Sequence, residues 1–222
     1  MQRTAAISVF LFLLVSFASA QYYPSFSLST GLDLQRSFKK DQQFWAVGHT
    51  TMANFHLSKK EGIYVWFSYY SDGKFDDAVT ATAKQPATIP QQVPYTNSTR
   101  IRFKHFSLGW KHYFKGAPEA EKGWNLYGNA GLGLMLGRVL NTHSVIIDTA
   151  DYNLPLLPGK ANFKRLTLDL GLGVEFPIGN DFFIYGESKV LLPTTDYPSP
   201  YIFINDKAPF TASAAVGLRL YF

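Results

Sequence analysis

Hydrophobic and polar residues alternate with a period of two along most of the chain. From Phe26 onward, apolar side chains occupy every second position, and small or polar side chains lie between them. A β-strand with one apolar face has this period, because successive side chains point to opposite faces. We count eight such segments: 26–35, 45–57, 63–70, 100–114, 124–136, 165–176, 182–190 and 210–222. The alternation is least clear in 63–70 and 182–190.

The connections between these segments come in two lengths. After the second, fourth and sixth segments they are short (58–62, 115–123 and 177–180), and after the third, fifth and seventh they are long (72–99, 139–161 and 191–209). The long connections hold most of the prolines and are rich in Thr, Asp and Asn, which predicts loops. The first connection, 37–42, is short and departs from the rule. Short and long loops that alternate around an even number of strands predict an up-and-down β-barrel.

The two faces of the predicted strands indicate the solvent around the barrel. One face is almost entirely Leu, Val, Phe, Ile and Ala, which in water would be a very large exposed apolar patch. The other face is small and polar, and its acids and bases are equal in number, as charges paired inside a narrow barrel would be. We predict that these residues form a charge network in the lumen: Asp33, Lys111, Arg165, Asp169, Glu175, Glu187, Lys189 and Arg219.

The sequence therefore predicts an all-β fold, an eight-stranded antiparallel up-and-down transmembrane β-barrel spanning 21–222. Aromatic residues gather near the short connections, where an interfacial girdle of a membrane barrel would lie. They are Phe55, Trp110, Tyr113, Phe114, Trp124, Tyr127, Phe176, Phe182, Phe183, Tyr221 and Phe222. The alternative is a soluble protein, either a lipocalin-like barrel or an ordinary β core rich in aromatic residues.

The first twenty residues have the pattern of a cleaved signal peptide. Arg3 precedes an apolar or small stretch over 5–17, and Ala18-Ser19-Ala20 supplies the small-x-small pattern that signal peptidase recognises, with cleavage before Gln21. The alternative, a membrane anchor, needs roughly 20 apolar residues, and this stretch is shorter. No later apolar run is long enough for a transmembrane helix. We expect residues 1–20 to be removed.

Composition excludes several classes of protein. The absence of cysteine excludes a disulfide scaffold, a Cys-ligated zinc site, a thiol nucleophile and a lipidated N-terminal cysteine. The net charge is +5, but the 17% of charged residues are scattered in both signs and form no basic stripe for a phosphate backbone. We therefore predict no cofactor and no nucleic-acid partner.

The chain resembles the small bacterial outer-membrane barrels of the OmpA and OmpX kind. The resemblance rests on the signal peptide, the eight amphipathic strands and the terminal segment 214–222. That segment has a C-terminal Phe222 after the alternating Val216, Leu218 and Leu220, similar to the signal that the barrel-assembly machinery recognises. The Gln at the predicted cleavage site and the Gly-Leu-Gly repeats at 131–133 and 171–173 are similar to barrel proteins of Bacteroidetes. The resemblance implies that both termini are periplasmic and that the long loops face outside.

One arrangement of residues suggests chemistry. His105-Phe106-Ser107 resembles the His-x-Ser motif of outer-membrane lipid A deacylases, in which the His activates the Ser. The alternation turns both residues toward the lumen, away from lipid, and Leu108 and Gly109 stand where that family has Asn and Gly. We predict no catalytic residues. The other histidines lack the spacing of a metal site, and the alternation places His49 and His112 on the lipid face, where they fit poorly.

Three basic residues share the outward face of the fourth segment. We predict that Arg100, Arg102 and Lys104 lie level with the phosphates of lipopolysaccharide and contact them. The alternative is that these side chains are simply solvated at the base of a loop. The predicted partners are thus outer-membrane lipid, lipopolysaccharide, the assembly machinery and an extracellular ligand of the long loops. The leading hypothesis is a non-enzymatic outer-membrane protein with a filled lumen and a structural or surface-interaction role. The alternatives are a narrow pore or a component of a secretion apparatus similar to PorT and, third, a lipid A hydrolase.

Overall fold

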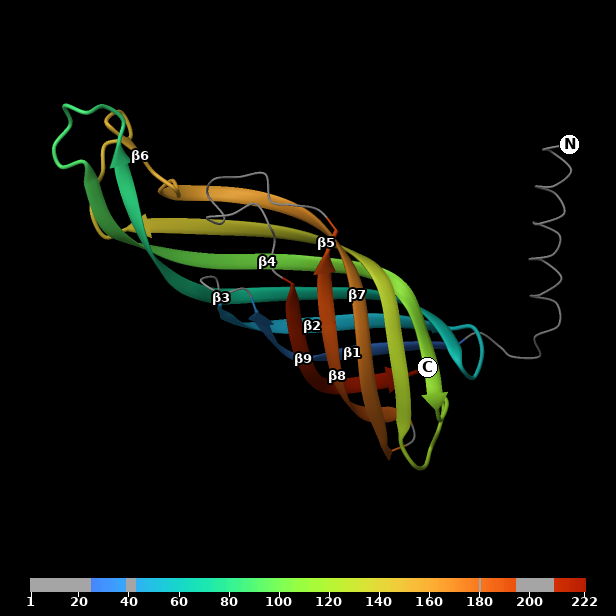
Figure 1. Cartoon of the computed structure of the whole chain (residues 1–222). Coiled ribbons are helices and arrows are strands. Elements are labelled where there is room, and N and C mark those ends of the chain that lie inside the picture. Colours follow the sequence, from blue (N-terminus) through green and yellow to red (C-terminus); the bar gives the residue numbers. More distant parts are fainter. Residues whose placement is uncertain (1–24, 39–42, 180, 195–209) are drawn as a thin grey trace, which may run out of the picture.

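A computed structural model describes residues 25–38, 43–179, 181–194 and 210–222. The predicted signal peptide and its cleavage site at Ala18 and Ala20 lie outside these residues. The described residues form nine strands, all of which are shown in Figure 1. They are β1 (Ser25–Ser37), β2 (Trp45–His56), β3 (Glu61–Ala83), β4 (Gln92–Lys115), β5 (Asn125–His143), β6 (Tyr152–Asn153), β7 (Gly159–Gly179), β8 (Phe182–Pro193) and β9 (Thr211–Tyr221).

Eight of these strands form a closed antiparallel ring. Each pairs with its neighbours along the chain, β1 pairs with β9, and β2 pairs with β3, so the sheet has no open edge around the ring. The two-residue β6 lies outside the ring and pairs only with the end of β3. The predicted eight-stranded antiparallel up-and-down barrel is therefore confirmed. Among the described residues, no helix is long and apolar enough to cross a membrane.

Side chains along each strand alternate between the lumen and the outer wall. In β7, Leu166, Leu168 and Leu170 are exposed, whereas Thr167 and Asp169 between them are at most 1% exposed. The same alternation runs through the burial pattern of β1, β2, β4 and β8. Because the pleat fixes the period at two, one buried position on a strand sets the face of every other residue.

Strands extend into two of the three segments predicted as long loops, and most of the third, 195–209, lies outside the described residues. β3 continues to Ala83 and β4 begins at Gln92, so only 84–91 remains of the loop predicted over 72–99. β5 and β7 likewise extend into the predicted loop 139–161. Polar residues fit on the inner face here because they bond to one another: Asn97, Thr99 and Asn141 are at most 3% exposed and are joined by hydrogen bonds. Of the described prolines in these predicted loops, Pro94 is the third residue of β4, Pro193 is the last residue of β8, and the others lie in connections, as expected of a residue that cannot donate to a ladder.

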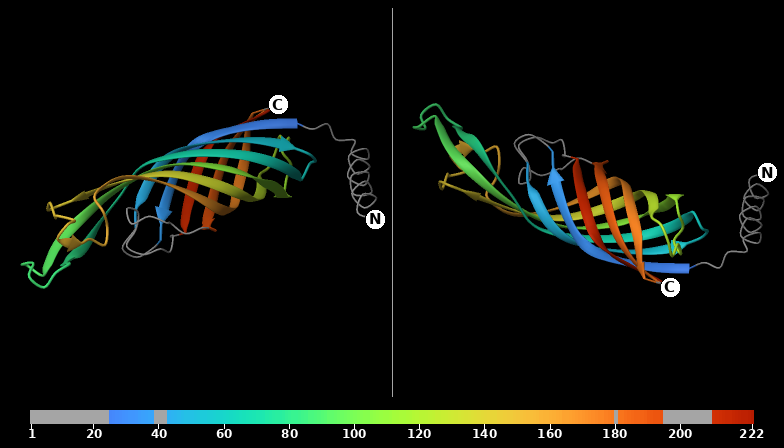
Figure 2. Two further views of the ribbon diagram at one scale, coloured as in Figure 1. Left: turned by 90° about the horizontal axis from the view of Figure 1, so that it is seen from above. Right: turned by 90° about the horizontal axis from the view of Figure 1, so that it is seen from below.

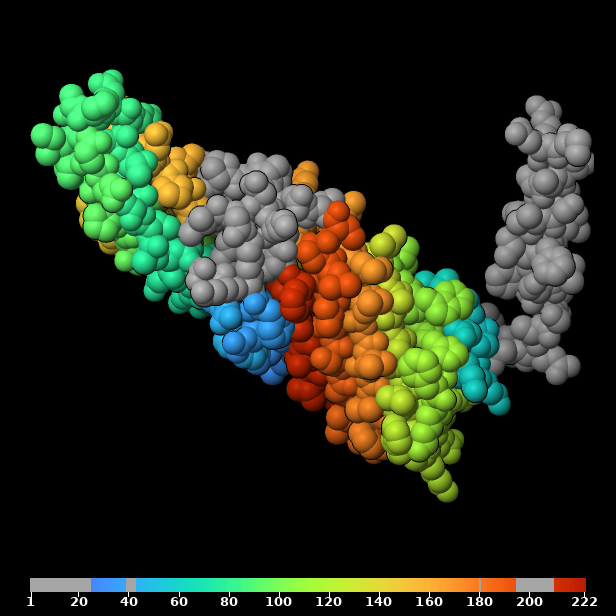
Figure 3. Space-filling view, in the orientation of Figure 1, coloured from blue at the N-terminus to red at the C-terminus, as the bar shows by residue number. Residues whose placement is uncertain are grey.

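The four long strands lie side by side and form one wall that rises above the barrel. Figures 1 and 2 show the ends of β3, β4, β5 and β7 projecting far past β1, β2, β8 and β9. We call this projecting four-stranded sheet the extension. The pairing of β2 with β3 stops at Val47 and Ser71, and that of β7 with β8 stops at Thr167 and Pro193. In the space-filling view the barrel and the extension form one elongated body (Figure 3).

A β-bulge marks the point where β3 leaves the ring. The register between β3 and β4 shifts between Tyr70 and Gly73, and Asp72 has a positive φ of 64°. Asp is one of the few residues that adopt this left-handed conformation readily. Bulges bend a strand and increase its twist, so this one directs β3 away from β2 and into the extension.

Candidate functional site

The lumen is filled by buried charged side chains. The eight acids and bases predicted to face it are each at most 6% exposed. Lys111 Nζ lies 2.7 Å from Glu175 Oε1, and Arg219 Nη2 lies 3.1 Å from Glu175 Oε2. Lys189 pairs with Glu187. Buried charges need partners of this kind, because an unpaired charge in a low-dielectric interior is very costly.

The short-turn end of the lumen is closed by the turn between β4 and β5. Arg219 Nη2 donates to the carbonyl oxygen of Pro118 at 2.9 Å. Asn125 Nδ2 donates to the carbonyl of Ala117 at 2.9 Å and lies 3.4 Å from Glu175 Oε2. The same carboxylate thus joins the lumenal bases to the turn that covers them.

The lumenal network also includes neutral and aromatic members that the sequence prediction missed. The Tyr70 hydroxyl donates to Asp33 Oδ2 at 2.6 Å, so the partner of Asp33 is a phenol and not a base. Asn129 donates to Glu187. The alternation along their own strands places Tyr70 and Asn129 on the lumenal face, and this signal could have identified both as members. Their partners Asp33 and Glu187 lie two strands away in the sheet, so no single segment of sequence identifies the pairs. Arg165 is buried in the same lumen.

His105 and Ser107 both point into this interior and are at most 3% exposed. His105 Nε2 lies 3.0 Å from Asp169 Oδ2 and 3.2 Å from Thr167 Oγ1. The hydroxyl of Ser107 lies 3.5 Å from that of Tyr64, and no hydrogen bond joins it to His105. A pair that cleaves lipid would have to reach the outer wall, and this pair does not.

The outer wall carries a broad apolar belt. Leu32, Val47, Leu108, Leu132 and Leu172 are between 59% and 70% exposed, and they come from five different strands. Below the belt, at the short-turn end, large aromatic side chains face outward. These are Phe55, Trp110, Phe114, Trp124, Phe176, Phe182 and Phe222. A wall of this composition fits a hydrocarbon layer with an aromatic rim.

Four aromatic residues predicted for this girdle face the lumen instead. Tyr113, Tyr127 and Phe183 are at most 1% exposed, and Tyr221 contacts the inward His56, with ring centroids 5.8 Å apart. Inside, Lys111 Nζ lies 3.6 Å from the Tyr127 ring centroid. The prediction considered only the position of these residues along the barrel axis. Because side chains alternate along a strand, every second residue at that level points into the lumen.

The two misfit histidines are on the outer wall, as the alternation predicts, and both have partners there. His49 Nε2 lies 2.9 Å from Thr30 Oγ1. His112 Nδ1 lies 2.6 Å from Glu61 Oε1, and Trp110 also donates to Glu61. In the described part of the chain, no group of three or more His, Asp and Glu side chains is placed to hold a metal ion.

Arg100, Arg102 and Lys104 are exposed on the outer wall, but not at the end of their strand. β4 continues for eight residues beyond Arg100, from Thr99 to Gln92, so the three lie at mid-strand, where the extension leaves the barrel. Arg100 Nε donates to Asp72 Oδ1 at 2.8 Å. The Arg100 guanidinium holds the pKa of Asp72 below its ordinary value of 3.8, so Asp72 is ionised at neutral pH.

The predicted assembly signal lies on β9, which closes the ring with β1. Val216, Leu218 and Phe222 are exposed on the outer wall, and Leu220 on the same face is partly exposed. The backbone N–H of Phe222 donates to the carbonyl of Phe26 at 2.8 Å, so the last residue is hydrogen-bonded to the first strand.

No protein-family model and no curated protein sequence matches the chain. Solved structures do. Neisserial surface protein A is 11% identical, covering 89% of this chain and 97% of that chain with a TM-score of 0.57. A major outer membrane protein from Thermus thermophilus is 11% identical, covering 90% of this chain and 100% of that chain, with a TM-score of 0.55.

A third similar structure is Ail, the attachment invasion locus protein of Yersinia pestis, in complex with the heparin analogue sucrose octasulfate. It is 12% identical, covering 90% of this chain and 100% of that chain with a TM-score of 0.51. At such low identity these likenesses concern the fold alone. The chain has the fold of the small outer-membrane β-barrels.

Proposed function

We propose that the protein is a non-enzymatic integral barrel of a bacterial outer membrane that uses its extension to contact a partner at the cell surface. The observation that carries this proposal is the contrast between the two ends of the long strands. Within the ring, paired charges such as Lys111 and Glu175 fill the lumen. Beyond the ring, β3, β4, β5 and β7 continue as an ordered sheet with exposed side chains.

The filled lumen argues against a pore. An eight-stranded barrel has room for its own side chains and little else. The charges that occupy this lumen are hydrogen-bonded to each other and to the turn that closes it. A passage would require several buried ion pairs to break together, at considerable cost.

The extension is suited to contact because it is a continuously paired sheet that carries apolar side chains at its far end. Ile89 in the β3–β4 turn is 89% exposed, and Ile146 in the β5–β7 connection is 101% exposed. Lys84 Nζ donates to the carbonyl of Thr149 at 2.7 Å, so the two connections are joined. The names of two similar proteins, a surface protein and an attachment protein, support a role of this kind.

The membrane orientation is tested by inserting a short epitope tag. One tag replaces part of the 85–91 turn, and a matched tag replaces part of 119–122 at the opposite end. In a Gram-negative host we expect intact cells to bind antibody only with the first tag, and permeabilised cells to bind it with both. Labelling of the 119–122 tag on intact cells, or a protein missing from the outer-membrane fraction, would contradict the proposal.

The filled lumen and the absence of catalysis are tested separately. In planar bilayers we expect the purified barrel to add no stable conductance steps, and discrete steps would favour the pore. A deletion strain with an altered set of secreted proteins would favour the secretion role. A Ser107→Ala strain is expected to keep an unchanged lipid A acylation profile, and a changed profile would favour the hydrolase.

A further inference from the structure

Six cationic side chains form one continuous patch on the outer wall of three neighbouring strands. We call this patch the basic band. It consists of Arg100, Arg102 and Lys104 of β4, Arg138 of β5, and Lys160 and Lys164 of β7. The strand register places Arg138 at its centre. Arg102 is directly opposite Arg138 on one side, and Asn162, flanked by Lys160 and Lys164, is opposite on the other.

Most of this charge is uncompensated by the protein. Asp72 pairs with Arg100, and within the described residues the other five cations form no ion pair. Like charges directly opposite on adjacent strands destabilise a sheet, since their Cβ atoms are only about 5 Å apart. The Arg102–Arg138 pair therefore has an unfavourable interaction that a bound anion would relieve.

The band is hollowed where the two arginines meet. Two surface grooves of about 480 and about 220 Å³ are both lined by Arg102 and Arg138. Lys104 and Lys164 line the larger groove, and Arg100 and Lys160 line the smaller one. Planar guanidinium groups bind phosphate oxygens through two parallel hydrogen bonds, which makes such a pair of arginines a phosphate site.

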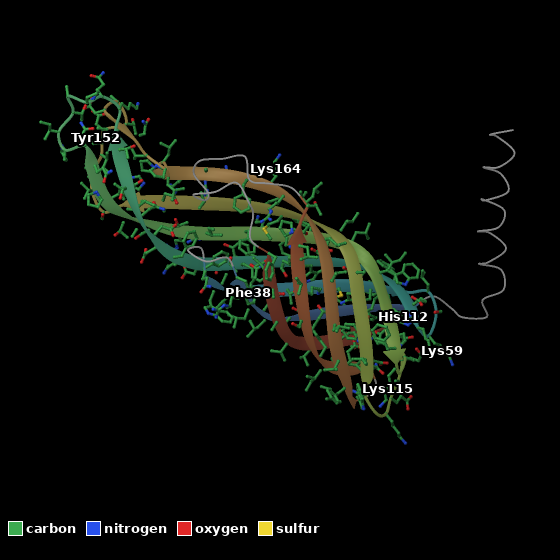
Figure 4. All side chains as sticks on the ribbon, in the orientation of Figure 1. Phe38, Lys59, His112, Lys115, Tyr152 and Lys164 are labelled. Atoms are coloured by element: carbon green, nitrogen blue, oxygen red, sulfur yellow. The ribbon has the colours of Figure 1, made fainter. Side chains whose placement is uncertain are left out.

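The ligand must also have an apolar part, because the basic band lies directly against the apolar belt. Toward the short turns, the outward side chains Phe106, Leu134 and Leu166 are register partners across the three strands. Phe106 and Leu166 lie two residues beyond Lys104 and Lys164, and Leu134 lies four residues beyond Arg138. Phe106, Leu134 and Leu166 are 44%, 39% and 53% exposed, respectively. Figure 4 shows Lys164 on the wall of the long strands, between Tyr152 near the tip and Lys115 at the short turns. From Lys104 to Arg100 the band extends about 13 Å, at about 3.3 Å per residue, enough for more than one phosphate.

We propose that the basic band binds the phosphorylated sugar headgroup of lipid A in the surrounding outer leaflet, with Arg138 at the centre of the site. The acyl chains lie on the apolar belt below, and the phosphates lie in the two grooves between the arginines and lysines. This proposal rests on the outer-membrane location proposed above, and it adds Arg138, Lys160 and Lys164 to the three residues that one strand alone suggested.

The test compares two triple variants in detergent micelles by native mass spectrometry. The site variant is Arg102→Gln, Arg138→Gln, Lys164→Gln, and the matched control, Lys59→Gln, Lys60→Gln, Lys115→Gln, removes the same charge at the opposite end. The probes are bisphosphorylated lipid A, monophosphorylated lipid A, phosphatidylglycerol, inorganic phosphate and sucrose octasulfate. Heat-modifiable migration on gels checks that each variant is folded.

We expect bisphosphorylated lipid A to bind the site variant at least about tenfold more weakly, since charge-assisted contacts are the strong ones lost. The control variant should bind like the wild type, and monophosphorylated lipid A and phosphatidylglycerol should bind the wild type more weakly. Equal lipid A binding by wild type and site variant would overturn the proposal. Wild-type binding of another probe as tightly as lipid A would also overturn the proposal. Equal binding of sucrose octasulfate would indicate a sulfated glycan as the ligand, equal binding of inorganic phosphate a free phosphate, and equal binding of phosphatidylglycerol any anionic lipid. If the site variant is folded and binds lipid A like the wild type, the lipid A site is overturned and the proposed function is not. Mislocalisation of the protein in the tag experiment would overturn the proposed function itself.

Discussion

Lys111 and Glu175 meet inside the lumen although a whole strand separates them in the sheet. Lys111 Nζ on β4 lies 2.7 Å from Glu175 Oε1 on β7, and β5 lies between these two strands. Both side chains are 1% exposed. The pair therefore joins strands that share no backbone hydrogen bond and stabilises the curvature of the ring from within.

Glu175→Gln should destabilise the barrel strongly. The variant leaves Lys111 and Arg219 buried without their shared carboxylate, and breaking a buried ion pair from one side costs about 3–5 kcal/mol. We expect the free energy of unfolding in detergent to fall by about that amount, measured by tryptophan fluorescence in urea. The control is Glu175→Gln combined with Lys111→Met, which removes a stranded charge and should recover part of the loss. A single variant as stable as wild type would show that water, not Glu175, compensates these bases.

Gly133→Ala should also destabilise the barrel, through steric crowding. A Cβ atom at Gly133 would lie 2.1 Å from His105 Nε2 and 2.4 Å from Asp169 Oδ2, so the His105–Asp169 contact would have to move. Overpacking of this kind costs about 1–3 kcal/mol. Gly186→Ala is the matched control, because its Cβ would meet only Val174 Cγ2, at 3.9 Å. Equal urea midpoints for the two variants would contradict the prediction.

The period of two predicts the ring but not the extension. In β7 the outward Leu166, Leu168 and Leu170 contrast with inward polar residues, because lipid requires one face to be apolar. Beyond the ring, Lys74 and Asp76 alternate with Phe75 and Asp77, and polar side chains appear on both faces. The contrast therefore disappears. The run Val79–Thr82, rich in β-formers, was the remaining signal for strand.

The basic band shows a second limit of sequence reasoning. Arg100, Arg102 and Lys104 share one strand and were found by their spacing. Arg138 is 36 residues beyond Arg102 in the numbering, and it joins the patch only through the β4–β5 register. A shift of one residue in that register would turn Arg138 to the lumen, so the patch depends on pairing that no single segment determines.

Acidification should loosen the tip of β5. Burial lowers the pKa of His143 below its usual value of 6.5, and its ring contacts Tyr95 with centroids 4.5 Å apart. The unfolded tip then binds more protons than the folded tip, so local stability is full above about pH 6.5 and falls as the pH drops toward the lower folded pKa. We expect amide hydrogen exchange in 93–99 and 139–143, corrected for the intrinsic rate, to be faster at pH 5 than at pH 7.5. In His143→Phe, which keeps the ring contact, this difference should vanish. Its persistence would exclude His143 as the cause.

The β3–β4 half of the extension should be removable without loss of the barrel. Joining Phe75 to Thr99, which are register partners, through an Asn-Gly turn deletes 76–98 and leaves every β2–β3 pair in place. We expect heat-modifiable migration and the amount in the outer membrane to match the full chain. Loss of heat-modifiable migration, with the 85–91 tag insertion still folded, would show that this half of the extension is needed for folding.

Deleting Phe222 should impair assembly in cells more than folding in detergent. The structure gives Phe222 one backbone pair with Phe26 and a ring contact with centroids 5.8 Å apart, which is a small share of the β1–β9 seam. The purified variant should refold, whereas its amount in the outer membrane should fall severalfold. Phe182→Ala, which also removes an exposed aromatic from the girdle, is the control. Equal losses in both variants would argue against a recognition signal at the C-terminus.

The places where strand pairing stops also limit how deep the protein can lie in a membrane. Among the described residues, the backbone bonds of β3 to β2 end at Ser71, and those of β7 on the β8 side end at Leu166, whose carbonyl accepts from the N–H of Thr194 after β8. Backbone N–H and C=O groups on such open edges need water, which the hydrocarbon layer cannot supply. The boundary of that layer must therefore lie at or below these two residues. Asp72 and Lys164 lie just beyond them, so the need to hydrate these backbone groups supports the proposed position of the basic band among the lipid headgroups, independently of its charges.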